Sequence, residues 1–101
     1  KRADVFLVAP ATANIIGKVA NGIADDMLCT TIMATRAKVI FAPAMNTNMY
    51  ENPIVQENIN KLKKLGYEFI EPASGILACG DEGNGKLADV NTIIDSVLDA
   101  L

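Results

Sequence analysis

The chain of 101 residues contains no histidine and no tryptophan, and its only aromatic residues are two tyrosines and three phenylalanines. The absence of histidine excludes a Cys–His–Asp nucleophilic triad within the chain and removes the commonest metal ligand. The two cysteines, Cys29 and Cys79, have neither the spacing of a zinc site nor the number that a disulfide framework needs. We therefore expect no metal site, and we expect Cys29, in an apolar helical stretch, to be a small core residue.

Clustered positive charge and long apolar runs are also lacking. The net charge is −3, and the densest basic cluster, Lys61, Lys63 and Lys64, has the pattern of a solvated helix face. This gives little electrostatic support for nucleic-acid binding. No apolar run approaches the roughly 20 residues of a membrane span, and we recognise no signal peptide. We expect a cytoplasmic protein that binds neither nucleic acid nor a membrane.

Aliphatic residues are abundant, because half of the chain is hydrophobic, which is enough for the core of one domain. Two short apolar runs, at residues 5–9 and 39–42, predict strands that a proline ends, and residues 67–70 predict a third strand. The first run is continuous rather than alternating, which is typical of a parallel strand that is buried on both faces.

Two helices are predicted between the first two strands. The first covers residues 13–20, with Thr12 as its N-cap and an Asn-Gly pair as its stop. The second covers residues 26–35. We interpret Asp25 and Asp26 as acidic residues at the start of this helix, which suit its dipole, rather than as an acid–base pair. This second helix is apolar on most sides, so we expect it to be buried against something outside the chain.

Two further helices complete the pattern. One runs to residue 65 with Asn52 as N-cap and Pro53 as first residue, and the other covers residues 91–101. The side chains that these helices should bury are Ile54, Val55, Ile59, Leu62 and Leu65 in the first, and Ile93, Ile94, Val97, Leu98 and Leu101 in the second. The order of elements predicts an open α/β fold with a parallel sheet between helical layers.

Polar residues follow the first two strands, at the carboxyl edge of the sheet where such folds bind ligands. Asn46, just after the second strand, has an amide that can grip a carboxylate, although Asn-Thr-Asn is also good turn chemistry. Thr12 and Asn14, after the first strand, can line a polar ligand, and capping of the helix is an equally good interpretation. The sequence therefore predicts one wall of a site here.

A thiol in a glycine-rich loop predicts the second wall. Cys79 lies in the long segment 71–88, between Ala78 and Gly80, and loops of this length are commonly functional. A free cysteine has a pKa of about 8.5, so near neutral pH the thiol is mostly protonated and suits a proton donor. From the residues alone, a nucleophile or a buried side chain remains an alternative.

Three segments together resemble a known family. PAMNTNMY at residues 43–50 resembles the motif PxMNxxMW, with tyrosine in the place of the last tryptophan. LACGD at residues 77–81, with the glycines and lysine that follow it, resembles the second signature of the same family, and APATAN at residues 9–14 resembles its PASANT segment. The family is that of the homo-oligomeric flavin-containing cysteine decarboxylases, which includes the phosphopantothenoylcysteine decarboxylases of coenzyme A biosynthesis.

The resemblance implies a Rossmann-like flavoprotein fold, here a partial three-layer α/β/α arrangement, and an FMN-dependent lyase. In that chemistry FMN oxidises the cysteine thiol of phosphopantothenoylcysteine to a thioaldehyde, carbon dioxide leaves, and the resulting enethiol is reduced to 4'-phosphopantetheine. Asn46 and Cys79 match the family's catalytic residues, the first gripping the substrate carboxylate and the second donating a proton. The implied substrate contacts are Asn46, Met49, Ala78 and Cys79, and the implied FMN contacts are Ala9, Pro10, Ala11, Thr12, Asn14 and Met45.

The resemblance also implies that residues are missing from this chain. The family's active-site histidine and phosphate-binding loop lie in sequence that would precede Lys1, so residues 1–101 are expected to be the C-terminal part of a single decarboxylase domain. Alone the chain is expected to be inactive. A companion N-terminal half is expected to complete the domain, and the complete protein is expected to form a homotrimer or a homododecamer. Two alternatives stay open: a peptidyl-cysteine decarboxylase of lantibiotic maturation, and a non-catalytic regulatory homologue.

Overall fold

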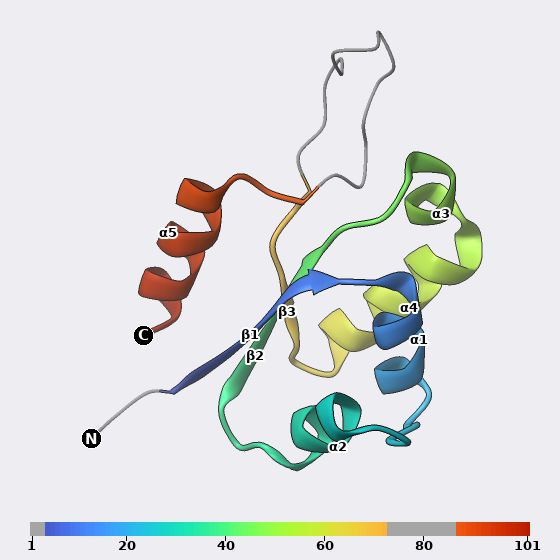
Figure 1. Cartoon of the computed structure of the whole chain (residues 1–101), viewed down its shortest axis with the longest axis horizontal. Coiled ribbons are helices and arrows are strands. Elements are labelled where there is room, and N and C mark those ends of the chain that lie inside the picture. Colours follow the sequence, from blue (N-terminus) through green and yellow to red (C-terminus); the bar gives the residue numbers. More distant parts are fainter. Residues whose placement is uncertain (1–3, 73–86) are drawn as a thin grey trace, which may run out of the picture.

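A computed structural model describes residues 4–72 and 87–101 of the chain. Three strands form a parallel sheet in the order β1-β2-β3, with β1 at Val5–Ala11, β2 at Lys38–Pro43 and β3 at Glu68–Phe69. The helices are α1 (Ala13–Ala20), α2 (Met27–Ala34), α3 (Thr47–Glu51), α4 (Pro53–Lys64) and α5 (Val90–Ala100) (Figure 1). The predicted open parallel sheet is confirmed.

Helices cover both faces of this sheet, because successive residues of a strand point to opposite sides. Figure 1 shows α1, α2 and α4 on one side and α5 on the other. On β2, Val39 and Phe41 pack toward α1, α2 and α4, whereas Ile40 and Ala42 lie in a separate cluster with residues of α5. The chain is therefore a three-layer α/β/α unit, as the sequence predicted.

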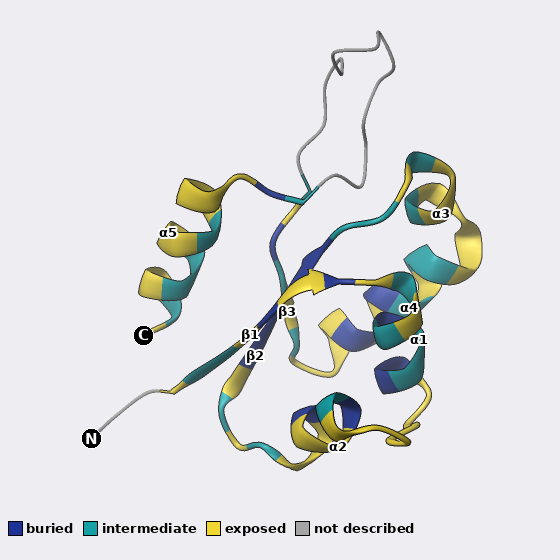
Figure 2. Ribbon diagram, viewed as in Figure 1, coloured by how far each residue is buried: buried dark blue, intermediate teal, exposed yellow. Residues whose placement is uncertain are grey.

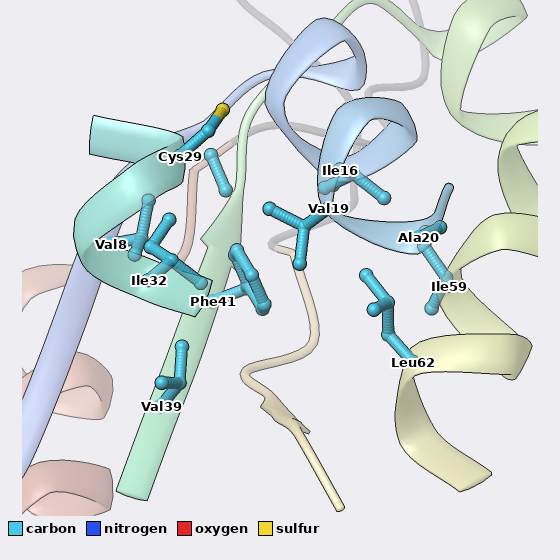
Figure 3. Close-up of a cluster of buried hydrophobic side chains, with 11 residues drawn as sticks. Val8, Ile16, Val19, Ala20, Cys29, Ile32, Val39, Phe41, Ile59 and Leu62 are labelled. Atoms are coloured by element: carbon cyan, nitrogen blue, oxygen red, sulfur yellow. The ribbon is translucent and has the colours of Figure 1, made fainter. Parts of the chain in front are cut away.

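The larger core cluster lies between the sheet and α1, α2 and α4. Its buried members are Val8, Ala11, Ile16, Val19, Ala20, Cys29, Ile32, Val39, Phe41, Ile59 and Leu62, drawn in Figure 3. Phe41 is fully buried, and its ring stacks on Phe69 with centroids 5.1 Å apart. Cys29 is also fully buried, which confirms the prediction that it is a core residue. This aliphatic cluster, with Phe41 at its centre, fixes β1 and β2 under the helices.

Side chains cap three of the helices, and two of these caps, Thr12 and Asn52, were predicted. Thr12 caps α1, Asp26 caps α2 and Asn52 caps α4, each accepting a hydrogen bond from a backbone N–H of the first turn. The helices α1 and α4 each end next to a glycine with positive φ, 71° at Gly22 and 102° at Gly66, a conformation that glycine adopts at little cost.

Two sequence predictions need correction. The segment after β2, for which a turn was one interpretation and no helix was predicted, forms the short helix α3 with Asn46 as its N-cap. The predicted buried stripes are only partly buried. In α4, Ile59 and Leu62 are buried, whereas Ile54 in the first turn and Leu65 just past the last turn are 67% and 65% exposed. In α5, Ile93 and Val97 are half-buried and Ile94, Leu98 and Leu101 are exposed (Figure 2).

The helix α2 buries only part of its apolar surface within the chain. Cys29 and Ile32 are buried, while Met27 is 84% exposed and Met33 is 45% exposed. This exposure agrees with the expectation that α2 is covered by another polypeptide, which stays a prediction. No helix among the described residues is both long and apolar enough to span a membrane.

Candidate functional site

The carboxyl ends of β1 and β2 lie side by side and bring two of the three sequence segments together. Ala11 is in register with Pro43, and the backbone N–H of Ala44 donates to the carbonyl oxygen of Ala11 at 3.0 Å. Residues 9–14 and 43–50, which are about thirty positions apart in the sequence, therefore meet at one edge of the sheet. This is the edge at which open α/β sheets bind their ligands.

The first segment exposes its backbone where β1 ends. The register between β1 and β2 shifts between Val8 and Ala11, and Ala9 and Pro10 are both exposed. Ala11 is fully buried and anchors the segment in the core. Thr12 Oγ1 accepts a hydrogen bond from the N–H of Ile15 at 3.2 Å, so the capping interpretation of Thr12 holds.

Asn14 lies in the first turn of α1 and is exposed. Together with Thr12 it places polar groups at the N-terminal end of α1, beside the exposed stretch of β1. The N-terminal end of a helix also presents unpaired backbone N–H groups. The N-terminal end of α1 can therefore donate hydrogen bonds to acceptor atoms of a ligand. Residues 9–11, just before it, offer only small apolar side chains.

Asn46 is held by the helix that it caps. Its Oδ1 accepts a hydrogen bond from the N–H of Met49 at 2.9 Å, and its carbonyl oxygen accepts one from the N–H of Tyr50 at 2.9 Å. Because a backbone N–H can only donate, the atom that it faces must be the side-chain oxygen, which fixes the orientation of the amide. The Nδ2 group of this exposed side chain, with its two N–H donors, is then the half of the amide that does not face Met49.

Two neighbours of Asn46 pack against the core, and a third is exposed. Met45 is half-buried and packs against the larger core cluster, whereas Met49 is 45% exposed. Tyr50 packs against the same cluster, and burial, followed by the charge of Glu71, raises the pKa of its hydroxyl. The Nε2 group of Gln56 donates to the carbonyl oxygen of Tyr50, which ties α3 to α4.

The predicted site residues therefore divide into two groups. Those brought together at the edge of β1 and β2 are Ala9, Pro10, Ala11, Thr12, Asn14, Met45, Asn46 and Met49. Ala78 and Cys79 lie outside the described residues. The structure thus describes one wall of the predicted site, and the role of each residue stays a prediction.

An ion-pair cluster at the far end of α1 from Thr12 was not found from the sequence. Lys18 Nζ lies 2.9 Å from Asp25 Oδ1 and 3.0 Å from Asp26 Oδ2, so it joins the end of α1 to the start of α2. Hydrogen bonds to both aspartates raise the pKa of Lys18. The spacing of seven and eight residues crosses the turn between two helices, so no helical periodicity in the sequence reveals it.

Asp26 is the most strongly held carboxylate of this cluster. The N–H of Cys29 donates to its Oδ1 at 2.7 Å, and this bond, followed by the bond from Lys18, lowers the pKa of Asp26 to about 2. Burial raises the pKa of the Cys29 thiol, and the carboxylate of Asp26 adds to this. Cys29 is therefore a neutral core group, which suits packing rather than nucleophilic chemistry.

Other surface features do not coincide with the predicted site. One hollow follows the outer side of α4, lined by Pro53, Asn60 and Lys64 among others, and a second lies where Thr35 and Tyr67 approach the start of β2. Neither hollow contains a predicted site residue. Within residues 4–72 and 87–101, no group of three acidic or cysteine side chains is close enough to hold a metal ion.

The chain is similar to known flavoproteins along its whole length. The sequence profile of the family described as Flavoprotein matches residues 1–101. A protein of Streptococcus mutans serotype c named probable phosphopantothenoylcysteine decarboxylase is 52% identical over 103 residues, which cover 100% of this chain and 58% of that protein. The chain thus spans little more than half of that relative.

Two solved structures are similar over nearly the whole chain. A cysteine-to-serine mutant of a PPC decarboxylase, complexed with pantothenoylaminoethenethiol, superposes with a TM-score of 0.86 at 40% identity, covering 95% of this chain and 54% of that one. The FMN-dependent cysteine decarboxylase SpaF superposes with a TM-score of 0.77 at 39% identity, covering 97% of this chain and 53% of that one. These likenesses confirm the Rossmann-like flavoprotein fold.

Proposed function

The chain belongs to the Flavoprotein family, and from this premise we propose that it forms part of an FMN-dependent phosphopantothenoylcysteine decarboxylase. The reaction would convert 4'-phosphopantothenoylcysteine to 4'-phosphopantetheine in coenzyme A biosynthesis. The observation that carries the proposal is the hydrogen bond between Ala44 and Ala11, because it sets the candidate flavin segment beside the candidate carboxylate-binding asparagine. The 52% identity to the Streptococcus mutans protein supports this choice of substrate.

The residues at the end of β1 fit a flavin. Ala9 and Pro10 are exposed and small, so a flat ring can approach the backbone without displacing a side chain. Met45 adds an apolar, polarisable surface, and Thr12 and Asn14 supply polar atoms for the rim of the ring or its chain. When bound, FMN would supply a two-electron oxidation and the matching reduction.

Asn46 would hold the substrate carboxylate. Its Nδ2 group can donate to one carboxylate while its Oδ1 remains bonded to Met49, and a charge-assisted hydrogen bond of this kind contributes about 1.5–3 kcal/mol. The bond fixes the orientation of the carboxylate relative to the thiol-bearing carbon. Once that carbon is a thioaldehyde, the electron pair of the breaking C–C bond moves toward sulfur, and carbon dioxide leaves.

A proton must then reach the carbon that lost the carboxylate. We assign this proton to the thiol of Cys79, which follows from the resemblance of residues 77–81 and lies outside the described residues. The two electrons removed from the thiol at the start return at this stage, so the reaction as a whole is a decarboxylation without net oxidation. Met49 and Ala78 would complete the substrate contacts.

The remainder of the protein would complete the site. We propose that an N-terminal part supplies the histidine and the phosphate-binding loop that this chain lacks, and that the protein assembles as a homotrimer or a homododecamer. The chain covers 54% of one similar structure and 53% of the other, which leaves room for such a part. On this basis the 101-residue chain alone should not turn over substrate.

The test uses a complete enzyme of known boundaries. In what we call the exchange enzyme, this chain replaces the 103 matched residues of the Streptococcus mutans relative. Release of carbon dioxide is measured with 4'-phosphopantothenoylcysteine and, separately, with a peptide that ends in cysteine, and the unaltered relative serves as control. We expect turnover of the first substrate only.

Two other results would overturn the assignment. Turnover of the peptide alone would favour the peptidyl-cysteine decarboxylase, an alternative supported by the 39% identity to the cysteine decarboxylase SpaF. Bound FMN without turnover of either substrate would favour a regulatory homologue.

A further inference from the structure

The short helix α3 depends on its neighbours for its position. It has five residues, none of them buried, and isolated helices shorter than about 12 residues are marginal in water. Figure 1 shows α3 beside the start of α4. Asn46, the candidate carboxylate-binding residue, is the N-cap of α3. Whatever holds α3 in place therefore also sets the position of the Asn46 amide.

A carbonyl oxygen near the end of α3 lacks its usual helical donor. In a continuing α-helix the carbonyl of Tyr50 would accept from the N–H of Ile54, four residues later. That N–H instead donates to Oδ1 of Asn52 at 2.8 Å, because Asn52 caps α4. The Nε2 group of Gln56, near the start of α4, donates to the Tyr50 carbonyl in its place. The amide of Gln56 thus satisfies a helix end that the backbone leaves open.

A series of three hydrogen bonds connects Gln56 to the side chain of Asn46. The first is the bond from Gln56 to the carbonyl of Tyr50. In the second, the N–H of Tyr50 donates to the carbonyl oxygen of Asn46 at 2.9 Å, and in the third, the N–H of Met49 donates to Asn46 Oδ1 at 2.9 Å. The helix α4, where the series starts, has two buried residues in the larger core cluster. The candidate ligand-binding amide is therefore connected to a core helix.

Apolar contacts hold α3 close to the core without fixing its rotation. Met45, just before α3, and Tyr50, within it, are half-buried against the larger core cluster. Burial of apolar surface is non-directional, whereas a hydrogen bond has preferred directions at the carbonyl oxygen. The bond from Gln56 to Tyr50 therefore adds the directional constraint that the apolar contacts lack.

We infer that Gln56 is a positioning residue of the decarboxylation, which holds α3 through the carbonyl of Tyr50 and so keeps the Nδ2 group of Asn46 in place for the substrate carboxylate. The inference rests on the proposed function. The amide of Gln56 donates within the protein, so it acts through Asn46 rather than on the substrate. A misplacement of about 1 Å can lower a catalytic rate roughly 100-fold, so loss of this bond should be visible in catalysis.

Removal of the Gln56 donor tests the inference in the exchange enzyme. Gln56→Met keeps the length of the side chain but has no N–H group, and kcat/KM for 4'-phosphopantothenoylcysteine should fall roughly 10-fold or more. Gln56→Glu, which has no donor when ionised, should lose a similar factor. Asn60→Leu removes an amide from an exposed residue one turn further along α4 and should change kcat/KM less than about twofold. Thermal midpoints check that every variant is folded at the assay temperature.

Two kinetic readouts separate the positioning of Asn46 from general stabilisation. The first is a double-mutant cycle with Asn46→Ser, which keeps a capping oxygen but lacks the amide N–H groups. In this background Gln56→Met should change kcat/KM less than about twofold, because the group that it positions is gone. The second is competitive inhibition by 4'-phosphopantetheine, which lacks the carboxylate. Its inhibition constant should stay within about twofold in Gln56→Met.

Amide hydrogen exchange tests the bond to Tyr50 without a measurement of activity. In Gln56→Met the amides of Met49 and Tyr50, which both donate to Asn46, should exchange roughly 10-fold faster than in the unaltered exchange enzyme. The amides of Ile40 and Phe41 in β2 should exchange at the same rate in both proteins and serve as the internal control for folding.

Three results would overturn the inference. The first is full activity of Gln56→Met beside an active unaltered exchange enzyme, which would leave the proposed function intact. The second is an equal loss of kcat/KM with and without the Asn46 amide, which would show a general structural role. The third is unchanged exchange at Met49 and Tyr50. An unaltered exchange enzyme that turns over neither substrate would overturn the proposed function, and with it the catalytic role of Gln56, whereas the amides would still show whether Gln56 holds α3.

Discussion

Asn46 and Met49 are joined by a 2.9 Å hydrogen bond in which the side-chain oxygen of Asn46 accepts from the backbone N–H of Met49. The bond caps α3 and at the same time fixes the orientation of the amide, with Oδ1 toward the N–H of Met49 and Nδ2 on the other half. From the sequence, Asn46 was expected either to form a turn or to bind a ligand. It can both cap a helix and bind a ligand, because the cap uses Oδ1 and a ligand would use Nδ2.

Substitution of Asn46 should separate these two roles. Asn46→Asp keeps an N-cap of similar strength, but it sets a carboxylate against the substrate carboxylate in place of a donor. We expect decarboxylation by the exchange enzyme to fall roughly 100-fold or more with an unchanged thermal midpoint. Asn48→Asp, the same change at an exposed neighbour, should retain activity within a few-fold. Normal turnover by Asn46→Asp would exclude the carboxylate-binding role.

Substitution of Cys79 should separate the decarboxylation step from the later reduction step. We predict that the exchange enzyme with Cys79→Ser still releases carbon dioxide but does not complete the reduction, because the proton donor is lost. Mass spectrometry should find a product that is lighter than 4'-phosphopantetheine by two hydrogen atoms. Cys29→Ala, at the buried cysteine, should give the normal product. If Cys79→Ser also gave the normal product, the acid would have to be another group.

The carboxylate of Asp26 should make stability depend on pH. Its pKa is about 2 in the folded chain against an ordinary value of 3.8, so the folded state binds this proton less tightly than the unfolded state. The stabilisation is therefore present above pH 4 and is lost as the pH falls from about 4 to about 2. Urea midpoints of wild type and Asp26→Ser, which keeps a cap, should converge over this range.

Lys18→Gln provides the matched control for that experiment. The largest cause of the low pKa of Asp26 is the bond from the backbone of Cys29, with Lys18 second. The variant should thus keep most of the pH dependence that Asp26→Ser loses. Equal losses in the two variants would show that the ion pair, rather than the cap, holds the carboxylate.

Phe41 should be the most sensitive position of the core. It is fully buried and contacts the rings of Phe69 and Tyr67, at centroid distances of 5.1 and 5.8 Å. Phe41→Ala should lower the free energy of unfolding by about 3–5 kcal/mol, which is a large part of the total for a small domain. Ile54→Ala, at an exposed residue, should change it by less than about 0.5 kcal/mol. Chemical denaturation of the exchange enzyme measures both.

Much of the fold was predictable because local signals were strong and consistent. The continuous apolar runs before Pro10 and Pro43 identified two strands, and the side chains of Thr12, Asp26 and Asn52 marked helix starts that the structure confirms. Each cap works within three residues of its own position, so its effect can be read from a short window of sequence.

Burial was less predictable because it depends on what surrounds a helix. Ile54 and Leu65 continue the apolar stripe of α4, yet both are exposed. In α5 the row from Val90 to Leu101 faces away from the sheet. Helical spacing shows that side chains share a face, but only the neighbouring elements decide whether that face is covered.

The sequence by itself determined which elements form, where three of its helices begin, and which motifs carry a resemblance to flavin-dependent decarboxylases. Only the tertiary structure decided that Ala44 bonds to Ala11, that Asn46 directs its Oδ1 to Met49, and that Lys18 joins two helices. The physical reason is range. Strand propensity and capping act between near neighbours in the chain, whereas these contacts exist only after the parallel pairing of β1 and β2 and the packing of α1 on α2 have brought distant residues together.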